Sequence, residues 1–93
     1  MEFFTDSYLE QAIGGTPLIQ LQNIVPSSSG KIWLKLESGN PTGSYKDRMA
    51  YAVVKNALAR GDINSGGCMV EYTGGSTGTA LAHVAARIGI KFI

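Results

Sequence analysis

From residue 31 onward, the spacing of apolar residues alternates between that of a strand and that of a helix. This order of segments constrains the fold more than any other feature of the sequence. Residues 31–37 place Ile32, Leu34 and Leu36 on one face and polar or aromatic residues on the other. A period of two over this length predicts a strand with one face directed inward. A shorter β-rich run precedes it at residues 16–21.

Two longer segments have helical spacing. The first is predicted to run from about residue 45 to residue 60 and to end at Gly61, and the second to run over residues 77–88 and to end at Gly89, because glycine is common just beyond a helix C-terminus. The first helix has a wide apolar surface, so we expect it to be mostly covered. The second has a stripe at the i, i+3, i+4, i+7 spacing of a buried face, formed by Leu81, Val84, Ala85 and Ile88.

Further strands are predicted at residues 68–72 and 90–93. The order strand, helix, strand, helix, strand predicts an α/β fold with a parallel sheet and right-handed crossovers, in which ligands bind at the carboxyl ends of the strands. A parallel sheet needs helices on both faces, and two helices cannot supply them well. The chain is therefore expected to be the front part of a larger fold.

Lys46 stands where a turn rich in glycine and proline, beginning at Gly39, becomes the first predicted helix. A charge there faces the positive end of the helix dipole and unpaired N–H groups, so the helix gains nothing from it. Lysine gives up its proton readily near positive potential or when desolvated, and a neutral amine attacks an aldehyde to form a Schiff base. We therefore predict a carbonyl-binding lysine. The alternative is a solvated charge cluster, since Asp47 and Arg48 follow directly.

A second loop, at residues 73–79, is rich in hydroxyl groups and glycines and joins a predicted strand to a predicted helix. Such a loop presents backbone N–H groups and side-chain donors at a helix N-terminus, which suits a carboxylate or a phosphate. Neither this loop nor the lysine turn has the Gly-x-x-x-x-Gly-Lys-Ser/Thr spacing, so a nucleotide P-loop is excluded.

Composition narrows the class of protein. The chain of 93 residues is 44% hydrophobic and 16% charged, with a net charge of +1, which gives no reason to expect nucleic acid or a membrane as a partner. The first six residues are acidic and lack a basic signal region, so a cytoplasmic protein is predicted. Cys68 is the only cysteine, which excludes an internal disulfide. No metal site is predicted.

Three single residues have plainer interpretations than catalysis. Cys68 and His83 are each unique and have no third orienting group, so a nucleophilic pair is not predicted. We expect Cys68 to be a small buried hydrophobic residue and His83 to be half-exposed on the second helix. Trp33 lies on the outward face of its strand, where it is available to cover another domain or subunit.

Four motifs occur in a distinctive order: Ile-Gly-Gly-Thr-Pro-Leu at residues 13–18, Leu-Lys-Leu-Glu at 34–37, Asn-Pro-Thr-Gly-Ser-Tyr-Lys-Asp-Arg at 40–48, and Glu-Tyr-Thr-Gly-Gly-Ser-Thr-Gly at 71–78. Together they resemble the cysteine synthase and cystathionine β-synthase family, the fold-type II enzymes that use pyridoxal 5′-phosphate. The resemblance implies a three-layer fold with a parallel sheet. Residues 1–93 would be its N-terminal third, a fragment of a tryptophan-synthase-β-like catalytic domain.

By that resemblance, Lys46 would hold pyridoxal phosphate as an internal aldimine and would later remove the substrate's Cα proton. Loss of a β-substituent from an activated serine would leave an aminoacrylate, which sulfide or a thiol attacks to give L-cysteine or a thioether. The family's substrate loop binds the amino acid carboxylate, and this role transfers to Thr73, Gly74, Gly75, Ser76 and Thr77.

The second loop departs from the family pattern, Ser/Thr-Ser-Gly-Asn-Thr-Gly, at two positions. Gly74 replaces the second hydroxyl residue, and Ser76 replaces an asparagine that touches the cofactor's 3′ oxygen in the family. A serine is shorter and carries one hydroxyl where an amide offers two donors, so Ser76 is expected to reach the cofactor through water or after a backbone shift. The departures bear on the choice of amino acid substrate and leave the Schiff base unaffected.

Family enzymes are about three times longer than this chain, and the resemblance implies a homodimer for the full-length form. The 93 residues alone are therefore predicted to be catalytically silent, which cofactor-dependent turnover by them would overturn. Two alternatives stay open. One is a Ser/Thr deaminase or threonine synthase of the same fold type, and the other is a non-catalytic remnant that binds anions.

Overall fold

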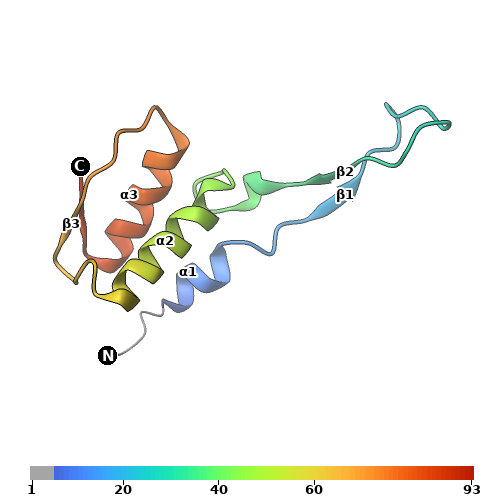
Figure 1. The fold of residues 1–93 in the computed structure, drawn as a ribbon. Helices are drawn as coiled ribbons and strands as arrows, with labels where there is room; N and C mark the ends of the chain where they lie inside the picture. Colours follow the sequence, from blue (N-terminus) through green and yellow to red (C-terminus); the bar gives the residue numbers. More distant parts are fainter. Residues whose placement is uncertain (1–5) are drawn as a thin grey trace.

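The computed structural model describes residues 6–93, so the acidic start of the chain lies outside the described residues except for Asp6. The elements are α1 (Ser7–Ala12), β1 (Leu18–Gln20), β2 (Trp33–Lys35), the 3-10 turn η1 (Glu37–Gly39), α2 (Lys46–Arg60), β3 (Cys68–Met69), α3 (Ser76–Ile88) and β4 (Lys91–Phe92). Figure 1 shows the helices gathered at one end and a long hairpin leaving them.

Both predicted helices are confirmed to within one residue at their starts. α2 begins at Lys46 and is capped by Gly61, and α3 begins at Ser76 and is capped by Gly89. The two glycines have φ of +78° and +77°, the left-handed conformation that side chains with a Cβ resist. The sequence signal at these ends is strong because the cap geometry requires that residue type.

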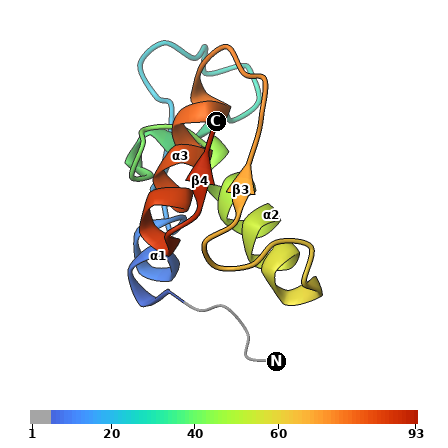
Figure 2. The ribbon, with the colours of Figure 1, turned by 90° about the vertical axis from the view of Figure 1, so that its left-hand side faces the viewer.

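α2 and α3 pack side by side, and their facing rows form most of the core (Figures 1 and 2). The buried apolar residues are Leu9, Ala50, Val54, Ala80, Leu81, Val84, Ala85 and Ile90. The stripe predicted on α3 is therefore confirmed, with Ile88 partly buried at its edge. The expectation that α2 is mostly covered is wrong on one side, where Val53 is 53% exposed.

The predicted parallel pairing is confirmed for the last two strands. β3 and β4 pair in parallel, with Cys68 opposite Lys91 and Met69 opposite Phe92, and α3 connects them. Cys68 itself is exposed in the described part of the chain, so the expectation that it is buried is wrong. Among the described residues Cys68 does not belong to the apolar core or to the residues packed against it.

The first two strands do not join that sheet. β1 and β2 pair only with each other, antiparallel, with Leu18 opposite Lys35 and Gln20 opposite Trp33. The connection between them is a loop and contains no crossover helix, and a loop of this kind joins antiparallel strands. A single parallel sheet through all strands was therefore the wrong expectation for this part of the chain.

The face of β2 that was predicted to point inward is also exposed to solvent in the part of the chain that the structure describes. Ile32 and Leu34 are 47% and 39% exposed, and Trp33 on the opposite face is 52% exposed, as expected for that residue. The molecule measures 55 × 29 × 19 Å because the hairpin extends away from the helices (Figure 1). A period of two marks a strand but does not say what covers it.

α1 was not predicted from the sequence. It is short, and its start is fixed by Asp6, whose side chain accepts a hydrogen bond from the Leu9 amide at 3.1 Å. Leu9 is fully buried against the core. At the same end His83 is half-buried, as expected, and its ring meets that of Tyr8 edge-on at 6.0 Å. Within residues 6–93 no helix is long and apolar enough to cross a membrane.

Candidate active site

Lys46 is the first residue of α2, and the turn before it fixes its backbone. Its amide donates a hydrogen bond to Ser44 Oγ at 3.2 Å, which caps the helix start in place of the flanking Tyr45. The side chain is half-buried, and its Nζ lies 5.0 Å from the centre of the Tyr45 ring. Among the described residues no carboxylate forms an ion pair with Nζ. The amine is thus available to react.

Asp47 is not part of a solvated charge cluster. Its side chain is fully buried and accepts hydrogen bonds from the Thr42 amide at 2.8 Å and from Thr42 Oγ1 at 2.6 Å. A buried carboxylate needs such donors, because desolvation without them is costly. The charge-cluster alternative is therefore wrong for Asp47, whose charge turns inward and holds the loop that precedes Lys46.

Arg48, the third member of the motif, reaches back to Glu37. Its Nε lies 2.5 Å from Glu37 Oε1, and its Nη2 lies 3.1 Å from Oε2. Thr16 Oγ1 donates to the same carboxylate and accepts from Arg48 Nη2 at 3.2 Å. The bonds from Arg48, followed by that from Thr16, lower the pKa of Glu37 to about 2, and the carboxylate in turn raises the pKa of Arg48.

Asn40 completes this polar cluster, in which Thr16, Glu37, Asn40 and Arg48 join three of the sequence motifs. Asn40 is 4% exposed; its Oδ1 accepts from the Gly14 amide at 2.8 Å, and its Nδ2 donates to the Glu37 carbonyl at 3.0 Å. Sequence reasoning assigned none of these residues a role. The feature of the sequence that could have indicated them is that polar residues recur within motifs that otherwise have the composition of turns.

Gly14 shows why the first motif needs glycine at its second position. Its φ is +83°, and a Cβ placed there would lie 3.0 Å from Arg48 Nη1. Any larger residue would be strained and would press on the guanidinium that bonds Glu37. The first motif therefore contacts and supports the lysine motif, through Gly14 and Thr16 on one side and Asn40 and Arg48 on the other.

The second predicted loop is organised by Thr73. Its Oγ1 accepts hydrogen bonds from the Gly75 amide at 3.2 Å and from the Gly78 amide at 3.0 Å, which fixes the start of α3. Gly74, Gly75 and Ser76 are exposed, and Thr77 is half-buried. The amides in the first turn of a helix lack intrahelical partners and are suited to bind an anion.

The lysine turn and the second loop lie at the same end of the molecule. In Figures 1 and 2 the N-termini of α2 and α3 point the same way, towards the end that the C-terminus of β4 also reaches. Lys46 is the first residue of α2, and the second loop leads into the first turn of α3, so the two predicted sites lie at neighbouring helix starts. This shared end is the candidate active site.

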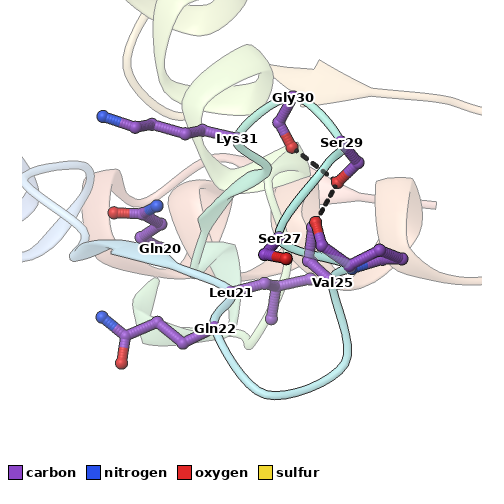
Figure 3. Close-up of a pocket in the computed structure, with 9 residues that line it drawn as sticks. Gln20, Leu21, Gln22, Val25, Ser27, Ser29, Gly30 and Lys31 are labelled. Atoms are coloured by element: carbon purple, nitrogen blue, oxygen red, sulfur yellow. Dashed lines mark hydrogen bonds between the residues drawn. The ribbon is translucent and has the colours of Figure 1, made fainter.

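A pocket of about 340 Å³ lies elsewhere, beneath the loop at the far end of the hairpin (Figure 3). Its walls come from the loop itself, where Ser29 Oγ donates to the carbonyls of Pro26 and Gly30 at 2.8 and 3.1 Å. Gln20, Gln22 and Lys31 also line it, and none of the predicted site residues does. This hollow follows from the course of the loop and is not the candidate site.

Comparison with known proteins identifies the relatives of this chain. The sequence profile of the family described as pyridoxal-phosphate dependent enzyme matches residues 9–93. Cysteine synthase B of Escherichia coli is 48% identical over 85 residues, which are 91% of this chain and 28% of that protein.

Two solved structures are also similar. O-ureido-L-serine synthase superimposes with a TM-score of 0.86 at 44% identity, covering 96% of this chain and 28% of its own. The O-acetylserine dependent cystathionine β-synthase of Helicobacter pylori superimposes with a TM-score of 0.81 at 36% identity, covering 96% of this chain and 30% of its own. The chain thus spans under a third of the length of each of these relatives.

Proposed function

Because the chain belongs to the family of pyridoxal-phosphate-dependent enzymes, we propose that the protein carrying it catalyses a β-replacement, forming L-cysteine or a thioether from an activated serine and sulfide or a thiol. Relatives named cysteine synthase and cystathionine β-synthase support this choice. The observation that carries the proposal is the amine of Lys46, which stands at a helix start with no carboxylate partner among residues 6–93.

The residues at this end of the molecule fit the cofactor. Lys46 would bind it covalently through Nζ, since among the described residues no carboxylate holds this amine in an ion pair. Ser76, exposed at the start of α3, would donate a hydrogen bond to it. When bound, pyridoxal phosphate supplies an electron sink for negative charge at the substrate's Cα.

The chain's own residues would then hold the amino acid and move its proton. Thr73, Gly74, Gly75, Ser76 and Thr77 would bind the substrate carboxylate at the N-terminus of α3, where free amides and the helix dipole favour an anion. Lys46 Nζ would accept the Cα proton, a role that requires it to lie within hydrogen-bonding reach of that carbon's hydrogen. The N-termini of α2 and α3 lie at the same end of the molecule, which supports these two roles for Lys46 and the second loop (Figure 2).

Turnover by the full-length protein tests the proposal. With pyridoxal phosphate, O-acetylserine and sulfide should yield cysteine, whereas serine or threonine alone should yield little oxo acid. Oxo acid as the main product would favour the deaminase alternative, and no product with any of these amino acids would favour the non-catalytic remnant. A homodimer and a cytoplasmic location belong to the same proposal and are checked by light scattering and by fractionation.

A further inference from the structure

Asp47 is the most deeply buried charged residue that the proposed chemistry does not use. Its exposure is 0%, and its two oxygens bond the amide and the hydroxyl of Thr42. Within residues 6–93 no cation forms an ion pair with it. Charged side chains are almost never fully buried without such pairing, so this site is built around hydrogen bonds and the positive end of the α2 dipole.

The two bonds close the chain between Thr42 and Asp47 into a ring that contains the turn before Lys46. Gly43, inside this ring, has a φ of +90°, which allows the reversal that the ring needs. Ser44 accepts the Lys46 amide from within the same ring. The backbone of Lys46 is therefore fixed from the preceding turn and from the residue that follows it.

We propose that Asp47 is a positioning residue for Lys46, an inference that rests on the proposed function. The lysine side chain is a flexible four-carbon stem, so the place that its amine can reach is set by where its backbone is anchored. The ring closed by Asp47 is that anchor. Asp47 itself does not touch the reacting atoms, because its oxygens are occupied by Thr42 and it is closed to solvent.

The test measures how fast Lys46 captures the cofactor, which does not depend on turnover. Cofactor-free, full-length protein is mixed with pyridoxal phosphate, and the rate is followed by absorbance; borohydride reduction and peptide mass then locate the bond. Asp47→Ala removes both bonds and should slow capture roughly 10- to 100-fold, the loss expected for a misplacement of about 1 Å. Thr42→Val removes the hydroxyl bond and keeps the amide bond, so it should slow capture by less. The double variant should be no slower than the slower single variant, because both remove one arrangement.

Val54→Ala is the matched control. Val54 is also fully buried on α2, but it lies two turns further along and packs in the apolar core, not against the loop. Its loss destabilises the protein without touching the ring, so capture by the folded fraction should keep the wild-type rate. The folded fraction of each variant is measured by urea denaturation before rates are compared.

The outcomes separate the two proposals. If the wild-type protein captures no cofactor at Lys46, the proposed function is wrong. If it does, and Asp47→Ala and Thr42→Val capture at the wild-type rate, the positioning role is wrong while the function stands. Slowing by Val54→Ala equal to that by Thr42→Val would also overturn it, since stability alone would then explain both. Thr42→Val keeps the test decisive should Asp47→Ala fail to fold.

Discussion

Gly78→Ala tests how the second loop packs against the start of α3. Its effect on the free energy of unfolding should change sign when the methyl group of Thr73 is removed. Alanine in place of glycine inside a helix normally stabilises it by about 1 kcal/mol. At this position, however, the new Cβ would lie 2.5 Å from Thr73 Cγ2. Carbon atoms are comfortable at about 3.5–4.0 Å, so Thr73 must move by roughly 1 Å or rotate.

Either movement disturbs the two hydrogen bonds that Thr73 Oγ1 accepts from Gly75 and Gly78. Losing both costs about 2 kcal/mol, and residual crowding adds about 1 kcal/mol. After the helix gain of about 1 kcal/mol is subtracted, Gly78→Ala should destabilise the protein by about 2 kcal/mol. In a Thr73→Ser background, which keeps Oγ1 and lacks Cγ2, the same change should stabilise it by about 1 kcal/mol.

Urea denaturation of the wild-type protein, the two single variants and the double variant measures all four free energies of unfolding. The predicted coupling between positions 73 and 78 is about 3 kcal/mol, well above the error of such cycles. Equal effects of Gly78→Ala in the wild-type and Thr73→Ser backgrounds would refute the reasoning. That result would mean that Thr73 Cγ2 does not crowd position 78 at the start of α3.

Two further predictions concern the polar cluster of Thr16, Glu37, Asn40 and Arg48. The folded-state pKa of Glu37 is lowered to about 2 from an ordinary 4.5, chiefly by Arg48. The contribution of Glu37 to stability is therefore fully present above about pH 4.5 and is lost as the pH falls towards 2. Glu37→Gln should flatten the measured dependence of the free energy of unfolding on pH between these two values. Asn40→Ala leaves the partly buried Gly14 amide without its acceptor and should destabilise the protein by about 1–3 kcal/mol in urea denaturation, whereas Asn56→Ala on the exposed face of α2 should change little.

The parts of the fold that the sequence predicts well are those decided locally. Both long helices end at a glycine, and the residue type and the left-handed backbone require each other, so Gly61 and Gly89 could be recognised without tertiary information. α1 was missed because a helix of six residues has too few turns for a periodic pattern. Only its cap at Asp6 marks it, and aspartate has many other uses in loops.

Long-range pairing could not be predicted in the same way. The alternation in residues 31–37 identifies a strand, but the choice between an antiparallel hairpin with β1 and a place in the sheet of β3 depends on the connecting loop. Exposure of Leu34 likewise depends on what packs over the strand, which no local pattern encodes.

The candidate site divides in a similar manner. Lys46 stands out because a cation is unusual at a helix start, and the second loop stands out because hydroxyl groups and glycines cluster in it. The roles of Asp47 and Arg48 could not be predicted, because one is buried and both pair with residues earlier in the chain, at Thr42 and Glu37. The sequence shows that these charged residues are present, but not whether they are buried or with which residues they pair.

The most direct measurement is the position of the cofactor bond in the full-length protein. Incubation with pyridoxal phosphate, reduction with borohydride and peptide mass analysis should place one phosphopyridoxyl group on Lys46, and the Lys46→Ala variant should lose both this peptide and the visible absorbance. Labelling of another lysine at the same yield, or unchanged absorbance and cysteine formation in Lys46→Ala, would contradict the account.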